Sequence, residues 1–268
     1  VYFWKKTMKN VVFYGGGNIS QAVAEGLIKS GFEKNKIFYV DRNPKNKRIL
    51  KKLQINNLEG NNTLKVDLFI LAVKPKDAIN AYKEILEKYK RPKIISFVAG
   101  IKSKRYLKIN QDIEFLRAMP NTSSKFNLGI TAIFNSSFKK NNLKKVISLF
   151  KRIGMTIELE KEVKIDGFTG MVGSGPAYFF YLLKSYEKKL MSLCNKDKKK
   201  VNDIMVNLMK GISLSIEKDN LDNLIMAVAS KKGTTEAGLK SFKSNKLDKI
   251  FEQGLDSAIK RSREISDE

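Results

Sequence analysis

Short apolar runs alternate with amphipathic stretches along the first 160 residues of the chain. The β-rich runs predict strands at 11–14, 37–40, 68–73, 94–98, 114–118, 130–134 and 155–159. Apolar spacing near the helical period predicts helices at 19–30, 77–90 and 141–151. Strands that alternate with helices in this way are typical of parallel βαβ units. The pattern therefore predicts an α/β fold with a doubly wound sheet.

The β-rich runs stop near Glu160, and only helical spacing follows. Helices are predicted at 176–193, 201–217, 221–229, 235–242 and 247–264. The change of pattern predicts a dinucleotide-type domain over residues 1–160 and an all-α domain over residues 161–268. Residues 1–7 precede the regular pattern, so we interpret them as an extension outside the fold.

The chain is strongly basic, with a formal net charge of +25 from 52 Lys and Arg against 27 Asp and Glu. A charge of this size raises the hypothesis of a nucleic-acid partner. The basic residues are spread evenly, however, and the densest run, 196–200, lacks the interleaved aromatic side chains of a single-strand binding surface. We therefore interpret the charge as a solvated lysine surface and expect no nucleic acid.

The absence of histidine limits the chemistry further. Catalytic triads that use an imidazole and zinc sites with histidine ligands are excluded, and we expect no metal. The one cysteine, Cys194, has no internal partner for a disulfide, which favours a reducing, cytoplasmic compartment. No apolar run approaches the roughly 18 residues needed to span a bilayer, so no membrane segment is expected.

A glycine-rich turn follows the first predicted strand and precedes the first predicted helix. Gly15 and Gly17 would let backbone N–H groups approach a pyrophosphate at the positive end of that helix. Ser20 occupies the third position of this fingerprint, so the turn by itself is a weak signal. Asp41, at the end of the second strand, is suited to the ribose hydroxyls of NAD, whereas Arg42 is suited to the 2′-phosphate of NADP. The sequence leaves the choice between NADH and NADPH open.

Special residues also follow the next strands of the predicted sheet. Lys74 and Pro75 come after the third clear strand, Ala99 comes after the next, and Met119 comes after the one that follows. Open α/β sheets bind ligands at the carboxyl ends of their strands. A small residue such as Ala99 would let a nicotinamide ring lie close to the sheet. Lys74 could equally be a surface lysine at the end of a strand.

Five motifs occur in a characteristic order along the chain. They are Gly-Gly-Gly-Asn at 15–18, Ala-Val-Lys-Pro at 72–75, Met-Pro-Asn-Thr at 119–122, Gly-Ser-Gly-Pro-Ala-Tyr at 173–178 and Gly-Thr-Thr at 233–235. In these motifs and their spacing, the chain resembles the pyrroline-5-carboxylate reductase family from about residue 10 to about residue 264. The later motifs are much more specific than the glycine turn.

The resemblance implies a function and an assembly. Members of this family reduce the C=N bond of 1-pyrroline-5-carboxylate to L-proline with NADH or NADPH, in the last step of proline biosynthesis. Their N-terminal Rossmann-type domain binds the dinucleotide, and their all-α C-terminal domain forms a homodimer, which in some cases assembles further. We therefore expect a cytoplasmic homodimeric oxidoreductase with a small-molecule substrate.

The resemblance also implies site residues. The expected cofactor-binding residues are Gly15, Gly17, Asn18, Ile19, Asp41, Arg42, Ala72, Val73, Lys74, Pro75 and Ala99. The expected substrate-binding residues are Ser230, Gly233, Thr234, Thr235, Ser174 and Met119. Thr235 is the expected catalytic residue, because it matches the threonine whose hydroxyl approaches the imine nitrogen in the family.

Structural roles are the alternative for several of these residues. Thr235 could be a hydroxyl that caps a helix, and Ser174 with Pro176 could start the helix that follows. The aromatic cluster at 178–181 is expected mainly to pack against other helices or to form the dimer interface.

The chain departs from the family pattern at two places. The substrate loop usually contains Ser-Pro-Gly-Gly, and here it contains Ser230, Lys231, Lys232 and Gly233. Lys232 at a position with positive φ would carry a strain of about 1 kcal/mol or more, although the two lysines could also attract an anionic substrate. Val172 stands where the family usually has a serine.

Three other functions are alternatives for this chain. A β-hydroxyacid dehydrogenase would need a catalytic lysine about four residues beyond the glycine-containing segment that starts its second-domain helix, here residues 173–175. Those positions are Tyr178 to Phe180 in this chain, and the first lysine after the segment is Lys184. A paralogue that acts on another cyclic imine, or that has a regulatory role, remains an alternative because the substrate loop is altered. A nucleic-acid-binding protein would show binding that falls steeply with salt and would need no dinucleotide.

Overall fold

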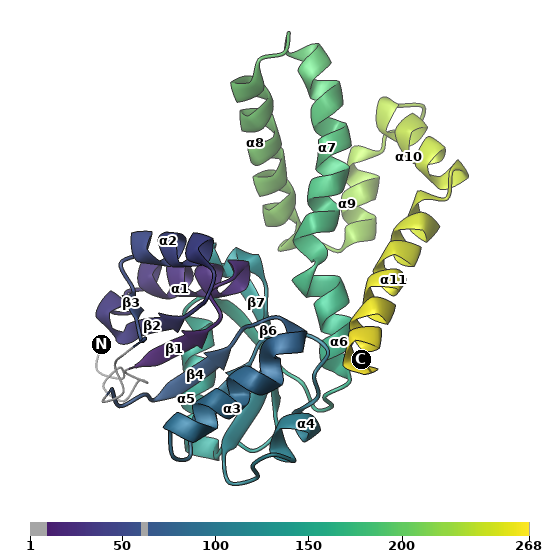
Figure 1. The fold of residues 1–268 in the computed structure, drawn as a ribbon. Coiled ribbons are helices and arrows are strands. Elements are labelled where there is room, and N and C mark those ends of the chain that lie inside the picture. The colour runs from purple at the N-terminus through teal and green to yellow at the C-terminus, as the bar shows by residue number, and fades with distance from the viewer. Residues whose placement is uncertain (1–9, 60–63, 268) are drawn as a thin grey trace. The chain divides into compact units, whose positions relative to one another are not determined.

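The computed structural model describes residues 10–59 and 64–267, and its ribbon is shown in Figure 1. The proposed extension at residues 1–7 lies outside the described residues. The chain divides into two units: residues 1–174 together with 258–268 form the first, and residues 175–257 form the second. The predicted boundary near Glu160 marks a change of hydrophobic pattern, whereas these two units are defined by contacts in space. The domain boundary therefore stays a prediction.

One sheet organises the first unit. Its strands within the described residues are β1 (Val11–Tyr14), β2 (Ile37–Val40), β3 (Asn56–Asn57), β4 (Leu68–Leu71), β5 (Lys93–Ser96), β6 (Glu114–Pro120), β7 (Gly129–Asn135) and β8 (Gly154–Glu158). Their order is β3-β2-β1-β4-β5-β6-β7-β8, and every pair is parallel except β6 with β7. The order reverses direction at β1, next to β4, so the predicted doubly wound sheet is confirmed.

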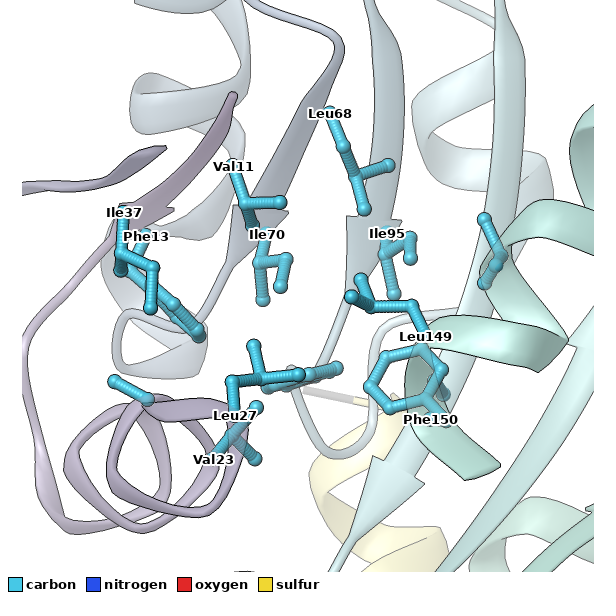
Figure 2. Close-up of a cluster of buried hydrophobic side chains, with 14 of the residues drawn as sticks. Val11, Phe13, Val23, Leu27, Ile37, Leu68, Ile70, Ile95, Leu149 and Phe150 are labelled. Carbon is cyan, nitrogen blue, oxygen red and sulfur yellow. The ribbon is translucent and has the colours of Figure 1, made fainter. Parts of the chain in front are cut away.

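Helices cover both faces of this sheet. They are α1 (Asn18–Lys29), α2 (Pro44–Lys52), α3 (Ala78–Lys88), α4 (Ser103–Leu107), α5 (Lys140–Lys151) and α6 (Lys164–Phe168). Side chains alternate along each strand, so Val11 and Phe13 face α1 and α5 in one buried cluster, which Figure 2 shows. Val12 and Tyr14 belong to the cluster on the other face, with α3 and α4.

Several details of the first unit differ from the predicted elements, and the two-residue β3 and the five-residue α6 are among the elements that were not predicted. Helices α2 and α4 were not predicted, because α2 is mostly lysine and asparagine with Leu50 as its one buried residue and α4 is only five residues long. Strand β4 ends at Leu71 rather than at residue 73. The chain leaves the sheet there, where the glycine-rich turn passes against Ala72.

The second unit is all-α. Its helices are α7 (Gly175–Leu193), α8 (Lys198–Ile216), α9 (Leu221–Val228), α10 (Thr234–Ser244) and the first part of α11 (Leu247–Asp267). The side chain of Asp197 accepts a hydrogen bond from the Lys200 N–H at the start of α8, and Asn220 does the same at the start of α9. All five helices predicted for this part of the chain are confirmed.

Candidate active site

A pocket of about 1060 Å³ lies at the carboxyl edge of the parallel strands. Its volume suits an extended ligand, because small-molecule sites usually enclose about 300–1,000 Å³. All of the cofactor-binding residues that the sequence predicts line this pocket: Gly15, Gly17, Asn18, Ile19, Asp41, Arg42, Ala72, Val73, Lys74, Pro75 and Ala99. The structure thus brings together residues from the ends of β1, β2, β4 and β5, which lie far apart in the sequence. Their individual binding roles remain predictions.

The glycine-rich turn fits a pyrophosphate on steric grounds. Gly15 has a φ of +101°, and a Cβ at this position would lie 2.5 Å from the carbonyl oxygen of Ala72, so only glycine is accommodated. At Gly17 a Cβ would meet no atom within 4 Å, so the space beside this backbone is open. Gly17 also caps α1 without a side-chain hydrogen bond and without an acidic residue in the first turn. The positive end of α1 is therefore accessible to a negatively charged ligand.

Ser20 takes the place of the third glycine of the fingerprint. Its buried hydroxyl donates a hydrogen bond to the carbonyl oxygen of Gly15. The serine therefore ties the first residue of the turn to the first turn of α1, which accounts for a residue other than glycine at this position.

The carboxylate of Asp41 stabilises the glycine-rich turn through a hydrogen bond from its backbone. One carboxylate oxygen accepts hydrogen bonds from the Gly16 N–H and from Asn46 Nδ2, and the other accepts one from the Asn43 N–H. A carboxylate has about four acceptor positions, so about one is left for a ribose hydroxyl.

Arg42 takes part in a contact across the pocket. Its Nη2 atom lies 2.9 Å from Oε1 of Glu84 on α3. The side chain of Arg42 is 89% exposed and that of Glu84 is 36% exposed. Both residues line the pocket.

Tyr14 ends β1 in the same pocket and was missed by the sequence analysis. Burial raises the pKa of Tyr14 to about 12, and the charge of Glu84 adds to the shift while that of Arg42 opposes it. The phenol is therefore neutral near pH 7. Its position at the last residue of a strand was a usable signal, whereas Glu84 lies on a helix and no local pattern marks it.

The end of β6 carries two further groups. Met119 is only 8% exposed and packs with Ala132 and Ile165. The side chain of Asn121 accepts a hydrogen bond from the Ile130 N–H, and its Nδ2 donates to the carbonyl oxygen of Val172 at 3.4 Å. The replacement of the family's serine by Val172 therefore leaves this contact intact, because Val172 contributes only its backbone carbonyl oxygen.

Ser174 follows a short π-helical turn, Thr169–Gly173, and its N–H donates to the carbonyl oxygen of Thr169. Its φ of −89° and ψ of −15° are helical. The interpretation of Ser174 as an N-cap was wrong, because an N-cap residue has an extended backbone. Pro176 does lie in the first turn of α7, as predicted.

The substrate loop, which we define as residues 230–235, lies in the second unit. Lys232 has a φ of 58°, so the condition under which a lysine at this position carries strain is met. Its N–H donates to Oε2 of Glu236 at 2.6 Å, and the Gly233 N–H donates to the carbonyl oxygen of Ser230 at 3.0 Å. These two hydrogen bonds hold the loop in this backbone conformation.

Thr235 lies in the first turn of α10. The N-cap of this helix is Gly233 and its first residue is Thr234, so Thr235 is the second residue of the helix and does not cap it. The alternative of Thr235 as the helix cap was therefore wrong. The side chain of Thr235 is half-buried.

A buried charged cluster joins β6 to the segment before α6. Arg117, on β6, is 1% exposed, and its Nη1 atom lies 3.1 Å from Oε1 of Glu162. The same carboxylate oxygen accepts hydrogen bonds from the N–H and the hydroxyl of Ser103. Asp166 on α6 is 2% exposed, and burial raises its pKa above the ordinary value although Arg117 acts in the opposite direction. Sequence analysis missed this cluster, because no pattern distinguishes a buried charge from an exposed one.

Two family models match the chain. The model described as Pyrroline-5-carboxylate reductase dimerisation matches residues 162–265. The model described as NADP oxidoreductase coenzyme F420-dependent matches residues 10–100. Across the described residues, the structure contains no helix with the length and apolar character of a membrane span.

Named proteins and solved structures are similar over nearly the whole chain. The pyrroline-5-carboxylate reductase of Staphylococcus epidermidis is 31% identical over 267 residues, which cover 96% of this chain and 97% of that protein. The enzyme of the same name from Haemophilus influenzae is 28% identical over 265 residues, with the same coverage. The structure of a pyrroline-5-carboxylate reductase from Coxiella burnetii matches with a TM-score of 0.81 and 26% identity, covering 97% of this chain and 99% of that chain.

A Rossmann-type domain with this pocket, followed by a helical domain, defines an NAD(P)H-dependent oxidoreductase. Identity of 31% over almost the full length of a named relative narrows the class to one family. The chain belongs to the pyrroline-5-carboxylate reductase family.

Proposed function

We propose that this protein reduces the C=N bond of 1-pyrroline-5-carboxylate to form L-proline, the last step of proline biosynthesis, with NADH or NADPH as the hydride donor. The observation that carries this function is the pocket at the sheet edge, which gathers every predicted dinucleotide residue in a chain of this family. The absence of histidine is compatible with the reaction, because a protonated or hydrogen-bonded imine is electrophilic enough to accept a hydride.

The first unit holds the dinucleotide. Backbone N–H groups at Gly17, Asn18 and Ile19 bind the pyrophosphate, where the open space beside Gly17 admits it. The segment 72–75 and Ala99 flank the nicotinamide half. When bound there, a reduced nicotinamide would supply the hydride for the ring carbon.

The substrate loop in the second unit holds the imine. Backbone N–H groups and hydroxyls at Ser230, Gly233 and Thr234 bind the carboxylate, and the positive charges of Lys231 and Lys232 attract it. The hydroxyl of Thr235 donates a hydrogen bond to the imine nitrogen, which makes the adjacent carbon more electrophilic. As the carbon gains the hydride, the C=N π bond breaks and its electron pair takes a proton from solvent at the nitrogen, so the product is a secondary amine.

Met119 and Ser174 also bind the substrate, and the two domains divide at about residue 160. The protein is a homodimer through its helical domain, in line with the dimerisation model that matches residues 162–265. We also propose that the dimers assemble further and that the protein is located in the cytoplasm.

The direct test measures oxidation of NADH and of NADPH at 340 nm with the purified protein. We expect oxidation that depends on added 1-pyrroline-5-carboxylate and that yields proline. A six-membered cyclic imine with a carboxylate serves as the control for the paralogue alternative, which the altered Lys231 and Lys232 keep open. Folded protein that binds dinucleotide and leaves the five-membered imine unreduced would contradict the proposed function.

A further inference from the structure

Arg42 is the pocket residue whose guanidinium suits a 2′-phosphate, and it already has an acidic partner. It follows the end of β2, where Rossmann-type domains bind the adenosine ribose. Its Nη2 atom lies 2.9 Å from Oε1 of Glu84, which comes from α3, 42 residues further along the chain. Both side chains line the pocket.

The surroundings of Arg42 are acidic although the chain is basic. The charged residues that line the pocket are Asp41, Asp77, Glu84 and Glu87 against Arg42, Lys74 and Lys83, an excess of one negative charge. The whole chain carries a formal charge of +25. Tyr14, the last residue of β1, lines the same pocket as Glu84 and Arg42.

Asp41 cannot replace Glu84 as the partner that restrains Arg42. Its carboxylate already accepts hydrogen bonds from Gly16, Asn43 and Asn46. Each of these holds it toward the glycine-rich turn and toward α2. Among the described residues, Glu84 is the carboxylate that contacts the guanidinium of Arg42.

We infer that Glu84 determines dinucleotide specificity by competing with the 2′-phosphate of NADP(H) for Arg42. This inference rests on the proposed function, since it concerns the same dinucleotide site. NAD(H) has a hydroxyl in place of the 2′-phosphate, so its binding does not require Arg42 to leave Glu84. Binding of NADP(H) does, and the ion pair therefore lowers the affinity for NADP(H) relative to NAD(H).

The test is equilibrium binding of NAD⁺ and NADP⁺ by calorimetry, without any imine. We expect Glu84→Gln to tighten NADP⁺ binding about two- to fivefold, the range of an exposed ion pair, and to leave NAD⁺ binding unchanged. Arg42→Gln should weaken NADP⁺ binding about tenfold or more, because it removes a charge-assisted contact to phosphate. In the double variant, the effect of Glu84→Gln should disappear.

Glu87→Gln is the matched control, since Glu87 is one turn along the same helix, lines the same pocket and carries the same charge. Equal gains in NADP⁺ affinity from Glu84→Gln and Glu87→Gln would overturn the inference, since the effect would then be general electrostatics. A gain from Glu84→Gln that persists in the absence of Arg42 would overturn it as well. Failure of the wild-type protein to bind either dinucleotide would instead contradict the proposed function.

Discussion

Several polar side chains of the dinucleotide pocket and beside the substrate loop form hydrogen bonds that fix the local backbone. Asp41 fixes the glycine-rich turn through the Gly16 N–H, and Ser20 fixes the same turn through the Gly15 carbonyl oxygen. Glu236 fixes the substrate loop through the Lys232 N–H. The hydrogen bonds at Gly15 and Lys232 stabilise backbone with positive φ, and the one at Gly16 fixes the adjacent residue of the turn, so together they preorganise N–H groups for a ligand.

The clearest prediction for a single residue concerns Thr235. Because Gly233 caps α10, the Thr235 hydroxyl is not needed to start the helix. Thr235→Ala should therefore lower kcat about 100-fold through the loss of the hydrogen bond to the imine, with dinucleotide affinity and Tm nearly unchanged. Steady-state kinetics and thermal unfolding measure the two effects.

Ser241→Ala is the matched control for Thr235→Ala, since it removes another hydroxyl from the same helix on an exposed face. Its kcat should equal that of the wild-type protein. A Thr235→Ala variant that kept its kcat would show that the hydroxyl takes no part in the reaction.

Among the secondary-structure elements, α6 and the segment before it contribute charged groups to a cluster with β6. The segment before it contributes Glu162 to the ion pair with Arg117, and α6 itself contributes Asp166. Buried charges are costly unless they are paired and hydrogen-bonded. Glu162 meets that condition with three hydrogen bonds from two residues, whereas Oδ1 of Asp166 has no hydrogen-bond partner among the described residues.

The buried carboxyl of Asp166 should make stability depend on pH. Its pKa is raised from 3.8, chiefly by burial, so the folded state binds this proton more tightly than the unfolded state does. By linkage, the free energy of unfolding falls as pH rises from about 4 through the raised pKa. Asp166→Asn removes this dependence and should raise the free energy of unfolding at pH 7 by about 1 kcal/mol.

Urea unfolding of the wild-type protein and of Asp166→Asn between pH 4 and pH 7 measures this effect. The difference in free energy should be small at pH 4 and should grow in favour of the variant as pH rises. Asp112→Asn, on the exposed surface, is the control and should show no such trend. If Asp166→Asn were less stable than the wild-type protein throughout, Asp166 would be a stabilising partner of Arg117.

At the scale of the whole molecule, the second unit exposes too many apolar side chains for a protein that acts alone. Phe179, Phe180 and Tyr181 on α7 are 59%, 67% and 75% exposed, and Met226 and Val228 on α9 are also mostly exposed. Large exposed apolar patches mark interaction surfaces. A homodimer built on these helices would cover them.

Phe180→Asp should therefore disrupt the dimer. A charge in place of a central aromatic side chain should weaken self-association about 100-fold or more, and sedimentation at micromolar concentration should show the monomer. Binding of dinucleotide should persist, because the pocket lies in the first unit. Leu128→Asp, at a residue of the first unit that is 77% exposed, should leave the dimer intact, and loss of the dimer in this control would undermine the assignment.

The order of the elements and the chemistry of the turns were determined by the sequence, because hydrophobic period and glycine sterics act over a few residues. The strand at 11–14 and the turn at Gly15 follow from such local rules. The tertiary structure decided which charged groups meet. Arg42 contacts Glu84 on another element, and Arg117 contacts Glu162, because folding brings together groups that are 42 and 45 residues apart in the sequence. Pairing at that distance depends on where whole elements pack, and no local pattern records it.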